Sequence, residues 1–123
     1  MTILHFDGQD RTDAGLADAE AAIRRLDGTE NTLVRVELSS GKTLTVGGGP
    51  GSVIVELADT SRDRWCVVDP TQGKGSMGLI VGGARAEYPA HQCVSIEAAL
   101  EAVRVFLTSD GERSACLMWS MRT

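Results

Sequence analysis

This sequence lacks the features that would tie the protein to a membrane or to a disulfide framework. No apolar run approaches the roughly 20 residues that a membrane-spanning helix needs, and the stretch from Met1 to Asp7 has no secretory signal. The three cysteines, Cys66, Cys93 and Cys116, are odd in number and lie among apolar residues. We therefore expect buried free thiols in a reducing compartment, and a soluble, cytoplasmic protein with no membrane contact.

Basic charge is also scarce. Lysine and arginine number 12 against 17 acidic residues, and the formal net charge is −5. Residues 1–30 hold seven acids and three arginines, whereas the rest of the chain is close to balance. Because binding to phosphates needs a basic patch, we expect no direct contact with nucleic acid. The acidic segment is either a solvated face or a surface that suits a basic protein partner.

Two glycine-rich segments, residues 47–51 and 73–76, invite comparison with phosphate-binding loops. A phosphate loop directs backbone N–H groups at an anion from the start of a helix. No helix is predicted after either segment, and Pro50 removes one of the donors. We interpret both segments as turns, and the second one as a loop that can adapt to a partner.

No catalytic or metal-binding set is recognisable. His5 and His91 lie in no metal-ligand spacing, so neither a metal nor another cofactor is expected. Cys93 is two residues from His91, and the two side chains would face the same side if they shared a strand. A Cys–His pair therefore stays open as an alternative, although no third member of a catalytic set is present. We predict that the protein is not an enzyme.

The periodicity of apolar residues predicts one α+β domain over residues 1–123. Thr12 or Asp13 caps a helix that runs to about Leu26, and Ser95 caps a second helix at 96–107. The expected strands are 32–38, 43–46, 52–58, 64–68, a short strand or half-hairpin at 79–81, and a closing strand at 115–119. Short connections require antiparallel pairing. We expect a mostly antiparallel sheet with the N-terminal and C-terminal helices packed on one face.

The last third of the chain carries a family resemblance. Its motifs are Tyr88-Pro89, the Val94-Ser95 cap, the alanine-rich helix with Phe106, and the closing Leu117-Met118-Trp119. Together with the strand-rich middle, this organisation over residues 32–121 resembles the immunity proteins of bacterial polymorphic toxin systems, in the family often paired with nucleic-acid deaminase toxins. The resemblance implies an α+β fold, no catalysis, and binding to a cognate toxin domain whose active site is covered.

Exposed loops on a rigid sheet usually carry recognition, so the expected toxin contacts lie in predicted loops. These residues are Asp59, Arg62, Asp63, Gln72, Lys74, Glu87 and Tyr88. Trp65 and Trp119 are expected in the core, whereas Tyr88 is the best aromatic anchor. Two other functions remain as alternatives. One is a small-ligand protein or enzyme that uses the glycine-rich segments or Cys93 and His91, and the other is a homo-oligomeric scaffold.

Overall fold

The computed structural model describes residues 2–6, 8–61 and 63–122. Its elements in chain order are β1 (Thr2–Phe6), β2 (Gln9–Thr12), α1 (Leu16–Arg24), β3 (Leu33–Leu38), β4 (Thr43–Gly48), β5 (Ser52–Ala58), β6 (Arg64–Val68), η1 (Pro70–Gln72), β7 (Ser76–Val81), β8 (Ala84–Pro89), η2 (Ala90–Gln92), β9 (Val94–Ser95), α2 (Ile96–Thr108) and β10 (Met118–Arg122). Within the described residues, eight strands form a main sheet, and β7 with β8 forms a separate hairpin. The α+β class is therefore confirmed.

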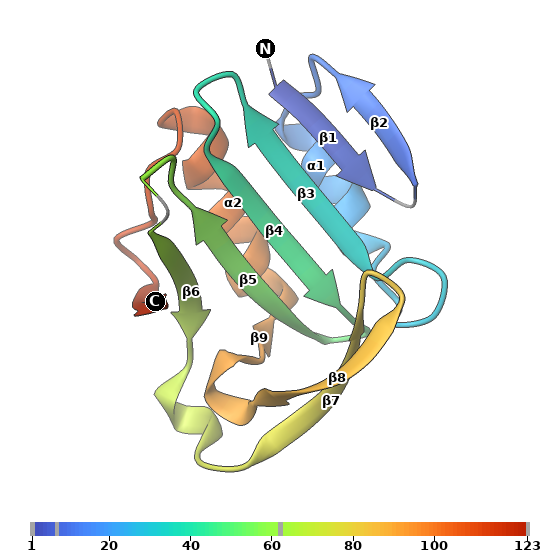
Figure 1. Ribbon diagram of the computed structural model, residues 1–123, viewed down its shortest axis with the longest axis vertical. Coiled ribbons are helices and arrows are strands. Elements are labelled where there is room, and N and C mark those ends of the chain that lie inside the picture. Colours follow the sequence, from blue (N-terminus) through green and yellow to red (C-terminus); the bar gives the residue numbers. More distant parts are fainter. Residues whose placement is uncertain (1, 7, 62, 123) are drawn as a thin grey trace.

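The main sheet is antiparallel throughout. Its strand order is β10-β6-β5-β4-β3-β1-β2, and β9 pairs with the start of β5. The predicted four-strand meander is β3 to β6, in sequence order. Figure 1 shows α1 and α2 side by side behind the sheet, so both helices cover one face, as expected. The hairpin crosses the lower end of the opposite face (Figure 1).

The core lies between the helices and the sheet. Every second residue of the central strands points inward and is buried, as in Val34, Val36 and Leu38 of β3. Phe106 of α2 is 0% exposed and is the largest fully buried side chain. Burying a side chain of this size stabilises the fold by roughly 1.5–3 kcal/mol. Trp65 and Trp119 pack against this core, partly buried, in agreement with the sequence prediction.

The helix starts follow from their caps. Ser95 caps α2 as predicted, because its hydroxyl oxygen accepts a hydrogen bond from the Ala98 N–H at 3.2 Å. The first helix begins at Leu16, later than expected, because Thr12 ends β2. Its N-cap is Gly15, whose N–H donates to the Asp18 carboxylate at 3.0 Å.

Residues 2–6 and 9–12 form two strands that were not predicted. Strand β1 pairs with β3, and its Leu4 is 1% exposed against the core. Strand β2 is exposed at all four residues and consists of Gln, Asp, Arg and Thr. Such a polar edge strand gives no apolar alternation, so nothing in the sequence marks it.

The short strand or half-hairpin expected at 79–81 is confirmed, because these residues belong to β7 of the β7–β8 hairpin. Three other expectations are corrected. Glu87 and Tyr88, which were expected in a loop, lie in β8. The closing strand begins at Met118 and not at residue 115. Cys116 is exposed, whereas Cys66 and Cys93 are buried free thiols as expected. In the described part of the chain, no helix is long and apolar enough to span a membrane.

Buried Ser114 explains the late start of β10. Its hydroxyl donates to the Glu101 carboxylate of α2 at 2.7 Å, and its carbonyl oxygen accepts from Trp119 Nε1 at 3.0 Å. These bonds hold the segment around Ser114 against α2, so the chain joins the sheet only from Met118 onward. The Ser114 hydroxyl and Arg104 stabilise the charged form of Glu101 and so lower its pKa.

Candidate functional site

The Cys93–His91 alternative fails on geometry. Cys93 is 1% exposed and its Sγ donates to the Pro89 carbonyl oxygen at 3.6 Å. Burial raises the pKa of this thiol, so it stays protonated near neutral pH, and the thiolate is the nucleophilic form. His91 is exposed on η2 and does not share a strand with Cys93. The pair therefore offers no activated nucleophile.

The first glycine-rich segment is closely packed at Gly47 and Gly49. A Cβ on Gly47 would lie 2.4 Å from Cγ1 of Val81 in the hairpin, and one on Gly49 would lie 2.6 Å from the Leu26 carbonyl oxygen. Both glycines are therefore sites of close packing between segments. No group of three or more metal-ligating side chains is present among the described residues.

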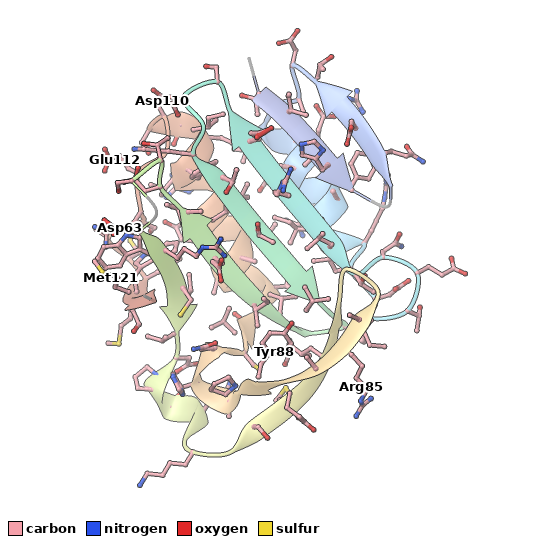
Figure 2. All side chains as sticks on the ribbon, viewed as in Figure 1. Asp63, Arg85, Tyr88, Asp110, Glu112 and Met121 are labelled. Atoms are coloured by element: carbon pink, nitrogen blue, oxygen red, sulfur yellow. The ribbon has the colours of Figure 1, made fainter. Side chains whose placement is uncertain are left out.

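The predicted contact residues fall into separate groups. Asp59 and Asp63 lie in the turn between β5 and β6, and Arg62 of the same turn lies outside the described residues. The Asp59 carboxylate accepts hydrogen bonds from the Thr60 backbone and side chain, and the backbone bond is the main reason that its pKa is lowered. Figure 2 shows Asp63 beside Glu112, away from the hairpin.

The remaining predicted contacts lie at the other end of β6. Gln72 and Lys74 are exposed just before the hairpin, and Glu87 and Tyr88 are neighbours on β8. Register places Tyr88 opposite Met77, on the face of the hairpin that carries buried Leu79. Tyr88 is accordingly half-buried, whereas Glu87 on the other face is exposed. The structure thus brings these four near the hairpin but leaves the Asp59–Asp63 turn apart from them.

A larger surface was missed by the sequence reasoning. The face of the main sheet opposite the helices carries polar side chains along its central strands, among them Arg35, Glu37, Thr43, Thr45 and Glu56. No helix covers this face in Figure 1. The sequence carried a signal for this surface, because polar residues alternate with buried ones in β3 to β5, which is typical of a sheet with one exposed face. Ion pairs such as Arg64 Nη1 to Glu56 Oε1, at 3.2 Å, cross it.

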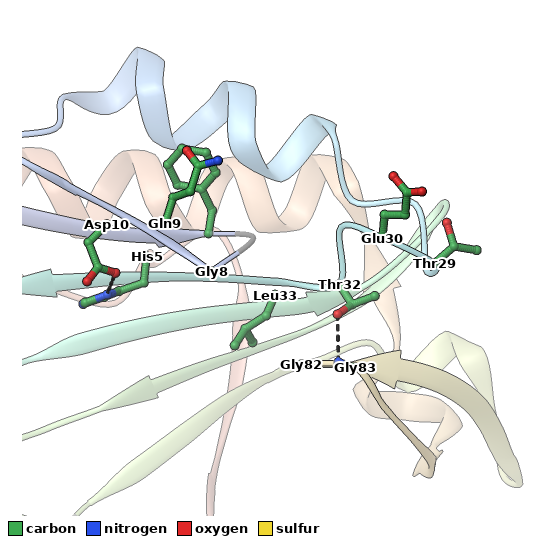
Figure 3. A pocket seen from close by; sticks show the side chains of 11 residues that line it. His5, Gly8, Gln9, Asp10, Thr29, Glu30, Thr32, Leu33, Gly82 and Gly83 are labelled. Carbon is green, nitrogen blue, oxygen red and sulfur yellow. Dashed lines mark hydrogen bonds and ion pairs between the residues drawn. The ribbon is translucent and has the colours of Figure 1, made fainter.

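A hollow of about 450 Å³ lies at one corner of the molecule, between the end of β1, the start of β2, the loop before β3 and the tip of the hairpin. We call it the corner hollow; its lining residues are His5, Phe6, Gly8, Gln9, Asp10, Thr29, Glu30, Thr32, Leu33, Gly82 and Gly83. Figure 3 shows buried Thr32 joining two of its walls. The Thr32 hydroxyl accepts from the Gly83 N–H at 2.9 Å, and its carbonyl accepts from Gly82 and Gly48.

Acidic groups dominate the charge of the corner hollow. Asp10 and Glu30 line it, and none of the described lining residues is lysine or arginine. Asp10 Oδ1 lies 2.5 Å from His5 Nδ1, and His5 Nε2 is 3.7 Å from Glu37 Oε1. Neither acid was singled out from the sequence. Only the fold brings strand β2, which carries Asp10, close to the loop that carries Glu30.

Residues 7–121 match the family model described as Immunity protein Imm1. The chain belongs to the Imm1 immunity-protein family. The match begins well before the resemblance seen at 32–121, so β2 and α1 lie within the part of the chain that the family model covers. Imm1 membership implies a toxin-neutralising function, a cognate toxin as partner and a non-enzymatic role. No curated protein matches the chain.

Proposed function

We propose that this Imm1 protein binds a cognate toxin domain one-to-one in the cytoplasm and neutralises it by covering its active site. The observation that carries the proposal is the family match over residues 7–121. The chain provides no activated nucleophile at Cys93, which favours inhibition by binding over catalysis. A stable interface of this kind buries roughly 1,600 Å² in total, and we assign it to the open sheet face and the hairpin, which no helix covers in Figure 1.

We further propose that the toxin is a nucleic-acid deaminase. An enzyme that acts on nucleic acid needs a basic cleft, because it must bind phosphates. A net charge of −5 on the immunity protein suits such a cleft and raises the rate of encounter. Charge alone does not distinguish a deaminase from a nuclease, so the deaminase proposal draws on the resemblance of the C-terminal motifs.

The proposed contacts include Asp59, Arg62 and Asp63 at one end of β6, and Gln72, Lys74, Glu87 and Tyr88 at the other. Described members of both groups are exposed or half-buried. A partner that spans the open face between them could touch both.

The test is co-purification with the toxin domain encoded immediately upstream, followed by titration calorimetry and a toxin assay on single- and double-stranded DNA and RNA. We expect nanomolar affinity, loss of toxin activity at one equivalent, and competition with substrate. Hydrogen exchange in the complex should show protection at both groups of proposed contacts. Absence of binding to a folded, active toxin domain would contradict the neutralising role. Binding without competition would contradict active-site coverage, and strand cleavage without deamination would contradict the proposed chemistry.

A further inference from the structure

The corner hollow is built by hydrogen bonds, not by loose loops. Asp27 Oδ1 accepts from the backbone N–H groups of Thr29, Glu30 and Asn31 at 2.9, 3.1 and 3.0 Å. These bonds hold the turn that carries Glu30. On the other side, Thr32 holds the hairpin tip through Gly82 and Gly83. The walls are therefore set in place before any partner arrives, which reduces the entropy cost of binding.

The lining has two kinds of surface. Leu33, half-buried beneath the hairpin tip, and Phe6 supply apolar area, and glycines open the walls. Asp10 and Glu30 supply negative charge; Glu30 is exposed, and its carboxylate has no hydrogen-bond or ion-pair partner among the described residues. Arg35 is the residue opposite His5 in the sheet, but it does not line the hollow.

This combination selects for one kind of side chain. Lysine and arginine have long apolar stems that pack on apolar surface and cationic ends that seek carboxylates. A toxin side chain that fills the hollow would displace water from beside the Glu30 carboxylate, so the attraction between the two charges would be screened less in the complex than at an open surface. An acidic or purely apolar side chain would leave Glu30 desolvated without a partner.

We propose that the corner hollow is an anchor site that receives an arginine or lysine side chain of the cognate toxin, with Glu30 as its main charge partner. The inference rests on the proposed function, since it presumes the toxin complex. It adds a location that the predicted contacts do not include. The start of β2 and the hairpin tip would then both contribute to toxin binding, because neither alone encloses the hollow.

The experiment compares Glu30→Gln and Glu30→Lys with Glu97→Gln and Glu97→Lys in titrations against the cognate toxin. Glu97 is an exposed acid in the first turn of α2, which lies on the other side of the sheet from the open face and carries none of the proposed contacts. We expect Glu30→Gln to raise Kd about tenfold and Glu30→Lys about a hundredfold, whereas the Glu97 variants stay within about threefold. Thermal unfolding checks that all four variants are folded, which their exposure favours.

A double-mutant cycle identifies the occupant. Each surface lysine and arginine of the toxin is replaced by methionine, and each variant is titrated against the unaltered protein and Glu30→Gln. We expect one toxin residue whose replacement makes Glu30→Gln silent. If the unaltered protein binds but Glu30→Lys matches Glu97→Lys, or no toxin cation couples to Glu30, the anchor site is wrong while the neutralising role stands. If the unaltered protein does not bind, both proposals fall.

Discussion

Two glycine-rich segments look alike in the sequence and behave differently in the fold. In residues 47–51, Gly47 and Gly49 pack so closely that an added Cβ would overlap Val81 and the Leu26 carbonyl. The second segment, extended to the hairpin tip, comprises residues 73–83; its Gly73, Gly75 and Gly83 have nothing within 4 Å of an added Cβ, and the nearest atoms to a Cβ on Gly78 would be those of the Arg85 and Glu87 side chains. At Gly47 and Gly49 the first segment therefore uses glycine for close approach to other segments, whereas the second uses it mainly for turns.

The two segments also contact each other. Val81 of the hairpin packs against Gly47, so the closely packed first segment is the base that positions the open second segment. At the free end, Gly82 and Gly83 have φ values of +61° and +82°, which suit a two-residue hairpin turn. A rigid base with an exposed tip is a good arrangement for presenting a binding surface.

The largest expected effect is a difference between matched substitutions, Gly49→Ala and Gly82→Ala. Both positions have positive φ, at +96° and +61°, so both variants carry a backbone cost of about 1 kcal/mol. Only Gly49→Ala also forces a Cβ against a backbone carbonyl, at 2.6 Å. We expect a loss of about 3 kcal/mol or more for Gly49→Ala and about 1 kcal/mol for Gly82→Ala, measured by urea unfolding. Equal losses of unfolding free energy for the two variants would contradict the claim that the first segment is the more closely packed one.

A smaller effect is expected at the contact between the two segments. Gly47→Ala should push the hairpin away from β4, because the new methyl group would lie 2.4 Å from Val81 Cγ1. We expect a loss of about 1–3 kcal/mol and faster hydrogen exchange in β7 and β8, with β3 and β4 less affected.

The control is the double variant Gly47→Ala with Val81→Ala, which removes the obstructing methyl groups. It should recover part of the stability, so that the two changes are not additive. Additive losses would show that Val81 does not rest on Gly47.

Much of the fold could be predicted because it depends on local patterns. Alternation of apolar residues gave the β3–β6 meander, and the Ser95 cap with its apolar stripe gave α2. The sequence could not show β2, whose four residues are all exposed and polar, or β8, where exposed Ala, Arg and Glu precede Tyr88. These strands form through pairing with β1 and β7, and pairing between segments leaves no periodic signature of its own.

The candidate site was harder to predict than the fold. Exposure could be anticipated for Asp63, Gln72 and Lys74, because polar turn residues lie at the surface. That Asp10, Glu30 and Gly83 line one hollow could not be anticipated, since Glu30 is 20 residues from Asp10 and 53 residues from Gly83 in the chain. Such a site is a product of topology, and only the arrangement of β1, β3 and the hairpin tip reveals it.

The smallest expected effect concerns the carboxylates that order turns beside the two segments. Asp27 accepts backbone hydrogen bonds from Thr29, Asn31 and Glu30, which lower its pKa from 3.8, and its turn packs Gly28 against Gly49. Asp69 accepts hydrogen bonds from the Thr71 hydroxyl and, second in effect, from the Thr71 backbone N–H; both lower its pKa, and its turn leads into the open segment. A lowered pKa in the folded state means stabilisation that is complete above about pH 4 and is lost as the pH falls through the folded value.

We therefore expect Asp27→Asn to lower Tm by a few degrees near pH 6, and Asp69→Asn to lower it less, because its turn is not packed against the core. Scanning calorimetry from about pH 6 down to about pH 2 should show each difference from the unaltered protein shrinking as the carboxylate becomes protonated. A difference for Asp27→Asn that stays constant with pH would mean that its charge does not hold the turn. If Asp69→Asn lowered Tm more than Asp27→Asn, the comparison of the two segments would be wrong. The fold should depend more on the Asp27 turn, because that turn packs against the first segment.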